Sequence, residues 1–327
     1  MSPHLKCVAA LSAIGIGSLS AAPARAQDNY PAKPIQLVVT TAAGGALDLV
    51  ARTVADRLSA AMHQPIIIEN QPAGNGGVAA GQFAKATPDG HTLMMVVDST
   101  VTINPHFYRN LAYDPFRDFA PVSVVTRLPL VLISNPAVQA TNLQELIALA
   151  KANPGKLNYA STGVGTQLHI GMEMFKLMTK TDIVHVPYRA TTGAMADLLG
   201  GRIDLALLGL SSARAPLESG KLRAYAIAAP QRSPLMPDVP SADEVGLPGY
   251  EVRSWFGMFA PARTPPAIVR RVNQHVVRVL GNADVAAKFF SFGQEPVANS
   301  PEEFDAWLKA DLRRWAKVVK EAGIRAD

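Results

Sequence analysis

Apolar residues follow two alternating patterns from about residue 30 onward. Short, nearly continuous apolar runs are each followed by a longer segment in which apolar residues recur every three or four positions. Short apolar runs are typical of buried strands, and a spacing of three or four residues is typical of amphipathic helices. Their alternation predicts βα units, an α/β fold and mainly parallel sheets. Strands are expected at residues 35–39, 66–69, 92–98, 130–133, 157–160, 183–186, 205–208 and 224–228, and helices at 47–62, 82–86, 143–152, 167–178, 194–199, 265–280 and 301–322.

One module occurs once in each half of the chain, namely a strand, a glycine-rich turn and a helix. The first turn covers residues 42–48 and the second covers residues 161–169. The first N–H groups of a helix have no partner within it and lie at the positive end of the helix dipole, and glycine lets an anion approach them closely. We therefore expect two turns at facing edges of two lobes to grip an anion at each end, and a dicarboxylate fits this arrangement. Neither turn carries a complete nucleotide-binding fingerprint.

Three side chains near these turns have alternative roles. Asp48 is expected to cap the helix and to pair with Arg52 four residues later, although it could also orient the loop or meet a ligand donor. His169, just inside the second helix, is expected either to pack or cap near the turn or to contact a ligand. Tyr188 follows a predicted strand and is expected at the edge of the core or in the wall of the site, whereas the adjacent Arg189 is expected to be a solvated surface charge.

Composition and motifs argue against catalytic, metal-dependent and nucleic-acid-binding functions. The chain is 48% hydrophobic and 17% charged, and its 6% aromatic residues are not interleaved with basic ones. It lacks G-x-S-x-G and H-E-x-x-H, and its histidines show no pair at metal-ligand spacing. No catalytic residue, metal or cofactor is therefore expected, and Trp255, Trp307 and Trp315 are interpreted as packing anchors.

Residues 1–26 have the features of a cleavable signal peptide. Basic residues precede an apolar run from Val8 to Leu19, which is shorter than the roughly 20 residues that span a bilayer, and Ala24-Arg25-Ala26 is a cleavage signal. Cleavage would leave 327 − 26 = 301 residues, lower the formal charge from +5 to 29 − 26 = +3, and remove Cys7, the only cysteine. We therefore expect an exported, periplasmic protein without disulfides.

The chain resembles the Bug family of extracytoplasmic solute receptors, the binding components of tripartite tricarboxylate transporters. The resemblance covers essentially the whole mature chain and depends on an ordered set of short segments. These segments are Gly44-Gly45-Ala46-Leu47-Asp48-Leu49-Val50-Ala51-Arg52, Glu69-Asn70-Gln71-Pro72-Ala73-Gly74-Asn75-Gly76-Gly77, Thr87-Pro88-Asp89-Gly90-His91, Tyr113-Asp114-Pro115, Asn153-Pro154-Gly155-Lys156, Gly163-Val164-Gly165-Thr166-Gln167-Leu168-His169, His185-Val186-Pro187-Tyr188, Gly220-Lys221-Leu222-Arg223 and Pro237-Asp238-Val239-Pro240.

The resemblance implies a two-lobed periplasmic-binding-protein fold of type II, a Venus flytrap, with two hinge crossings. Lobe 1 is expected at residues 27–126 and 250–327, and lobe 2 at residues 127–249. It also implies that a small organic carboxylate is held mainly by backbone amides and hydroxyls and is presented to membrane permease subunits, with the protein acting as a monomer. The candidate ligand-binding residues are Thr41, Ala43, Gly44, Gly45, Leu47, Asp48, Ser161, Gly163, Gly165, Thr166, His169, Tyr188 and Leu208.

Several of these positions depart from the common family pattern. Leu47 stands where Thr or Ser is usual, and Leu208 where an aspartate is frequent. The loss of that acid argues against an amino-acid ligand, whose ammonium group would need a partner. Both leucines would make the middle of the pocket more apolar, which favours an aromatic or aliphatic carboxylate.

Two other functions remain open from the sequence. The first is a ligand-sensing receptor for a membrane signalling partner, which would use the same closed form. The second is a secreted hydrolase that uses His169 with Ser161 or Thr166.

Overall fold

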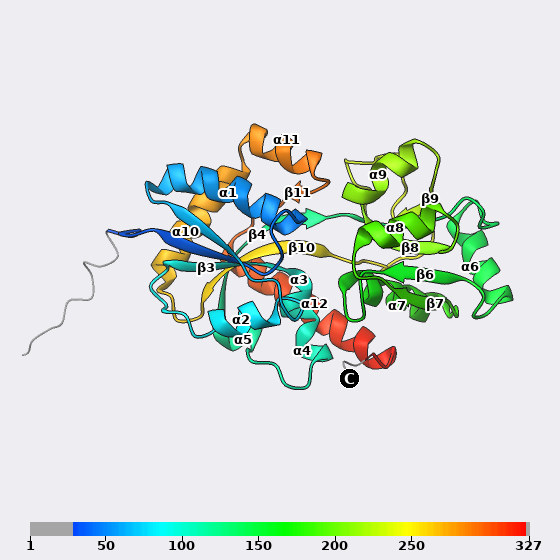
Figure 1. Ribbon diagram of the computed structural model, residues 1–327, viewed down its shortest axis with the longest axis horizontal. Coiled ribbons are helices and arrows are strands. Elements are labelled where there is room, and N and C mark those ends of the chain that lie inside the picture. The colour runs from blue at the N-terminus through cyan, green and yellow to red at the C-terminus, as the bar shows by residue number, and fades with distance from the viewer. Residues whose placement is uncertain (1–28, 325–327) are drawn as a thin grey trace, which may run out of the picture. The chain divides into compact units, whose positions relative to one another are not determined.

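The computed structural model describes residues 29–324, and the described residues from Pro31 onward belong to one compact unit. The expected signal peptide lies outside the described residues. Two sheets with helices on their faces confirm the α/β prediction (Figure 1). The strands are β1 Ile35–Val39, β2 Ile66–Asn70, β3 Thr92–Val97, β4 Phe119–Leu128, β5 Leu130–Ser134, β6 Asn158–Ser161, β7 Val184–Pro187, β8 Leu205–Gly209, β9 Arg223–Ile227, β10 Ser254–Pro261 and β11 Glu295–Pro296. The helices are α1 Ala46–Met62, α2 Gly77–Phe83, α3 Asp98–Thr102, α4 Asn104–Phe107, α5 Pro115–Asp118, α6 Leu143–Ala152, α7 Gln167–Thr179, α8 Thr191–Leu199, α9 Leu210–Glu218, α10 Pro266–Leu280, α11 Ala283–Ser291 and α12 Pro301–Glu321.

Both sheets are mixed, so the prediction of mainly parallel sheets is wrong. Sheet A has the order β11-β4-β10-β3-β1-β2 and sheet B the order β7-β6-β8-β5-β9. The βα modules pair in parallel, β1 with β2 and β3, and β6 with β7 and β8. The remaining pairs are antiparallel, and they involve the strands that carry the chain between the sheets.

The chain passes from sheet A to sheet B through Pro129, between β4 and β5, and returns into β10. Neither β4 nor β10 was predicted. All eight residues of β10 are buried, so the strand shows no alternation of polar and apolar positions, and Gly257 interrupts it. The two crossings agree in number with those the resemblance implies, while the lobe boundaries at 126/127 and 249/250 stay a prediction.

Most predicted helices form close to their expected limits. A capping box opens α12, with reciprocal bonds between Ser300 and Glu303. One helix differs, because the short helix expected at 82–86 instead covers Gly77–Phe83.

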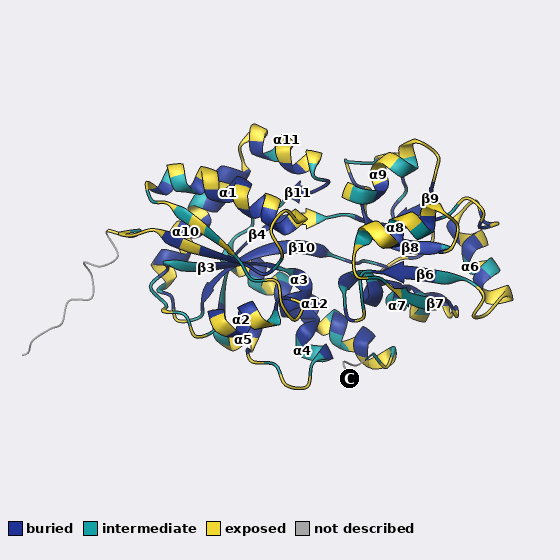
Figure 2. Ribbon diagram, in the orientation of Figure 1, coloured by how far each residue is buried: buried dark blue, intermediate teal, exposed yellow. Residues whose placement is uncertain are grey.

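Strands β5, β8 and β10 are buried on both faces, the edge strands β2 and β7 are partly exposed, and the other exposed residues gather on the outer helix surfaces and loops (Figure 2). Trp255 and Trp315 are fully buried, as expected for packing anchors, and Trp307 is half-buried beneath the Arg253 guanidinium, 5.3 Å from its ring centre. The first half of α12 packs in the sheet A core and its last turns pack with Phe175 of α7. The C-terminal helix therefore contributes to both cores. Within residues 29–324, no helix combines the length and apolar character needed to cross a membrane.

Candidate functional site

The first glycine turn joins β1 to α1 and is open to solvent. Residues 42–46 are exposed, and Gly44 has a φ of +81°, a backbone conformation that strongly favours glycine. Gly45 is the N-cap of α1, without a side-chain cap bond. The first-turn amides of Ala46 and Leu47 therefore point out of the helix end, without acceptors inside it.

Asp48 stabilises this turn from inside the protein. Its carboxylate accepts hydrogen bonds from the Gly44 N–H (2.9 Å), the Asn70 amide (2.9 Å) and Arg52 Nε (2.9 Å). Asp48 is 1% exposed. Burial by itself would raise the pKa of this carboxyl, but the bonds from Arg52, Gly44 and Asn70 outweigh it, and the pKa is lowered. The predicted Arg52 partner is thus present, whereas the backbone bond of Asp48 is to the Gly44 N–H, one residue before the N-cap, and stabilises the turn instead of capping the helix.

The second glycine turn joins β6 to α7 and is held by hydroxyl groups. Thr166 is the N-cap of α7, where it accepts from the His169 N–H, and its hydroxyl donates to the Gly163 carbonyl (2.8 Å). Ser161 is fully buried, and its Oγ accepts from the Gly163 N–H (3.1 Å). The exposed residue of this turn is Val164. The turn therefore directs its Gly163 amide inward, toward Ser161.

Two histidines lie against the inner side of this turn. His169 Nδ1 is 3.2 Å from the Gly165 N, and His185 Nε2 is 2.6 Å from Ser161 Oγ. His169 was predicted from the sequence as a candidate site residue, whereas the role of His185 was not predicted. The parallel register of β6 and β7 pairs Tyr159 with His185, and side chains two residues apart on a strand share a face, so this pairing could have indicated that Tyr159, Ser161 and His185 face the same side.

The remaining predicted site residues have different environments. Leu208 is fully buried in the cluster that includes Val131 and Leu198, and Leu47 is also buried. The Tyr188 hydroxyl donates to Asp197 (2.6 Å), and its ring packs beside the Leu208 cluster. Neither leucine exposes apolar surface to a ligand in this conformation. The Thr41 hydroxyl is covered and has no hydrogen-bond partner among the described residues.

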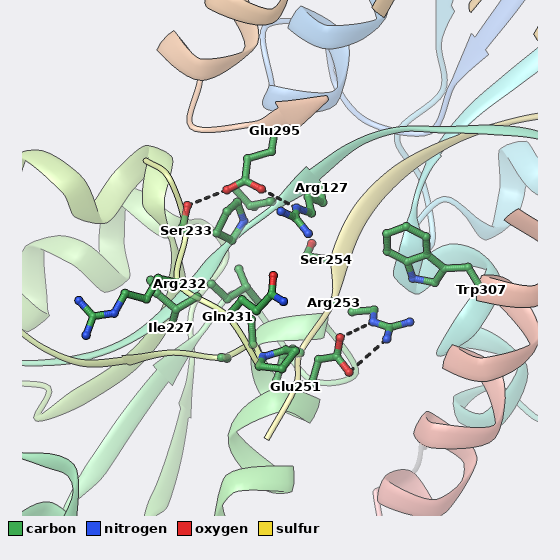
Figure 3. Close-up of a pocket in the computed structure, with 17 residues that line it drawn as sticks. Arg127, Ile227, Gln231, Arg232, Ser233, Glu251, Arg253, Ser254, Glu295 and Trp307 are labelled. Carbon is green, nitrogen blue, oxygen red and sulfur yellow. Dashed lines mark hydrogen bonds and ion pairs between the residues drawn. The ribbon is translucent and has the colours of Figure 1, made fainter. Parts of the chain in front are cut away.

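A separate cavity of about 330 Å³ lies where the chain crosses between the sheets (Figure 3). Its charged side chains are paired: Glu295 accepts from Ser233 (2.6 Å) and from Arg127, and Glu251 accepts from Arg253. None of the predicted site residues lines it. Over residues 29–324, no group of three or more His, Cys, Asp or Glu side chains could hold a metal ion.

The two-sheet α/β fold with two crossings defines a binding protein of the periplasmic class, and comparison with known proteins agrees. The family model of the tripartite tricarboxylate transporter family receptors matches residues 50–324, and the chain belongs to this family.

Similar proteins extend along nearly the whole chain. Protein BugT of Bordetella pertussis is 34% identical over 93% of this chain and 94% of its own length. Among solved structures, a Rhodopseudomonas palustris protein with adipate is 34% identical, with a TM-score of 0.79, covering 91% of this chain and all of that one. MatC of Rhodopseudomonas palustris, with bound malate, is 34% identical with a TM-score of 0.75, covering 89% of this chain and all of that one. The chain is thus a solute-binding receptor of a periplasmic family, and not an enzyme.

Proposed function

We propose that this protein captures an organic dicarboxylate between its two glycine turns and delivers it to the permease subunits of a tripartite tricarboxylate transporter. The observation that carries the proposal is the pairing of two helix starts, α1 with 17 residues and α7 with 13, each preceded by a glycine turn at the carboxyl end of a strand. Adipate and malate, the ligands of two relatives, are both dicarboxylic acids.

In this proposal backbone amides carry most of the recognition. Ala46 and Leu47 supply N–H groups at the first turn, and the Thr41 hydroxyl, which has no hydrogen-bond partner among the described residues, supplies a further donor. The Asp48 carboxylate does not repel the ligand strongly, because Arg52, Asn70 and Gly44 already neutralise and solvate it. Leu47 and Leu208 are buried, so they do not offer the apolar surface that would favour an aromatic ligand. A flexible dicarboxylate is therefore the better candidate.

The remaining parts of the proposal concern location and motion. The protein is exported by cleavage after residue 26 and acts in the periplasm as a monomer. Residues 27–126 with 250–327 and residues 127–249 act as lobes that close by bending at the two crossings. Deleting the gene and measuring uptake separates delivery from sensing: uptake should be lost, whereas intact uptake with lost gene induction would favour the sensing function.

Adipate is expected to raise the melting temperature of the purified mature protein, and hexanoate, which has the same chain length but one carboxylate, is expected to have little effect. A ligand at about 100 times its Kd adds about 2.7 kcal/mol of stability. For a protein of this size that corresponds to a shift of roughly 5 °C. A thermal-shift screen measures both, with malate as a second dicarboxylate. Equal shifts with adipate and hexanoate would contradict a grip at both ends of the ligand.

A further inference from the structure

A stack of three rings, of which Tyr159 and His169 are buried and His185 is half-buried, lies against the inner side of the second glycine turn. The ring centres of His169 and His185 are 4.1 Å apart with their planes at 25°, and His185 lies 4.9 Å from Tyr159. Tyr159 donates to Glu173 (2.6 Å), which also accepts from Lys176 (2.7 Å). The stack thus connects the turn to the middle of α7.

The hydrogen bond from Gly165 fixes the protonation of His169. A backbone N–H can only donate, so His169 Nδ1 must accept, and the ring carries its proton on Nε2. His169 is 5% exposed. Burial, together with the nearby His185 and Lys176, lowers the pKa of His169 to about 3, so the imidazole is neutral at ordinary pH.

His185 acts on the turn through Ser161. Its Nε2 is 2.6 Å from Ser161 Oγ, and that oxygen accepts from the Gly163 N–H (3.1 Å). Burial also lowers the pKa of His185, although Glu173 opposes the shift. Both glycine amides of the turn, Gly163 and Gly165, are therefore bonded on the side of the stack.

We propose that His169 and His185 are positioning residues, which hold the second glycine turn in its ligand-binding shape by bonding to Gly165 directly and to Gly163 through Ser161. The amides left to face an anion are then those of Val164, in the exposed part of the turn, and of Gln167 and Leu168, in the first turn of α7. This inference depends on the proposed function. In this proposal His169 does not contact the ligand directly, because its Nδ1, the ring nitrogen nearest the turn, already accepts a hydrogen bond from the Gly165 N–H.

A pair of variants at His169 tests whether Nδ1 must accept the hydrogen bond from Gly165. His169→Asn keeps an oxygen near the place of Nδ1, whereas His169→Leu keeps bulk without an acceptor. Calorimetric titration with adipate should show at least a tenfold weaker Kd for His169→Leu and a Kd within about threefold of wild type for His169→Asn. His275→Leu, on the half-buried side of α10, is the matched control and should bind adipate as wild type does. Equal losses in the Asn and Leu variants would overturn the proposal.

Amide exchange measured without ligand tests the positioning of the turn independently of dicarboxylate binding. The Gly165 amide should exchange with solvent at least tenfold faster in His169→Leu than in wild type, and at the wild-type rate in His169→Asn, as measured by NMR. If wild type binds no dicarboxylate but this pattern holds, the proposed function fails and the positioning of the turn stands. If His169→Leu does not fold, His185→Leu and His185→Gln give the same comparison at the Gly163 amide. Unchanged exchange in a folded Leu variant would overturn the inference.

Discussion

Replacing Asp311 with asparagine is expected to stabilise the protein at pH 8 and to leave its stability nearly unchanged at pH 4. Asp311 lies on α12 and is completely buried. One carboxylate oxygen accepts from Trp255 Nε1 (2.8 Å), and the other has no hydrogen-bond partner among the described residues. Arg253 lies 3.9 Å away. Asparagine can accept the Trp255 bond without carrying the buried charge.

The expected gain in stability at high pH follows from the pKa of the Asp311 carboxyl. Burial raises it from an ordinary 3.8 to about 6, despite the opposing effects of Trp255, Arg253 and Arg314. The native state thus binds this proton more tightly than the unfolded chain, so its contribution to stability is full below about pH 4 and is lost as the pH rises to about 6. At about 1.4 kcal/mol per pH unit, the loss is roughly 3 kcal/mol. The charge on Asp311 also raises the pKa of the buried Asp98, so the substitution relieves both groups.

Urea unfolding at pH 4 and pH 8 measures this effect. We expect Asp311→Asn to gain about 1–2 kcal/mol at pH 8, less than the full amount of roughly 3 kcal/mol, because the new amide N–H groups are themselves buried. Asp305→Asn is the matched control on the same helix, since Asp305 pairs with Lys309 at the surface, and should change stability by less than about 0.5 kcal/mol at either pH. A gain of equal size at both pH values would show that the charge of Asp311 is not its cause.

The sequence predicted those elements whose signals are local. Gly45 and Thr166 precede helices with a clear apolar face, and Ser300 forms a capping box, so α1, α7 and α12 could be placed within a residue or two. The Asp48 bond to Arg52 is local for the same reason, because residues four apart on a helix are neighbours.

What the sequence could not predict depends on residues distant along the chain. Strand β10 is buried on both faces between β3 and β4, so its sequence has no periodicity that distinguishes it from other apolar segments. The contact of His185 with Ser161 requires the register of two strands. Leu208 was expected in the pocket because the resemblance places a frequent aspartate at this position, but both faces of β8 are buried and Leu208 packs in the core. Tertiary packing decided each of these cases.

Replacing Gly165 with alanine is expected to destabilise the protein more than the same change at Gly44. Both glycines have positive φ, +77° and +81°, so alanine meets similar backbone strain of about 1–2 kcal/mol at each. Their surroundings differ. A Cβ on Gly165 would lie 2.8–2.9 Å from three carbons of the Phe107 ring, whereas a Cβ on Gly44 would meet nothing within 4 Å.

We therefore expect Gly165→Ala to lose roughly 1–3 kcal/mol more than Gly44→Ala in urea unfolding, because Phe107 is itself buried in the core and cannot move freely. Adipate titration of the same proteins separates the two roles of glycine. Gly44→Ala should fold and yet bind adipate more weakly, since its methyl group projects into the space from which an anion approaches the α1 amides. Gly220→Ala controls for strain alone, because Gly220 also has a positive φ and open surroundings but follows α9, outside both turns. If Gly44→Ala and Gly220→Ala bind adipate equally well, the first turn takes no part in recognition.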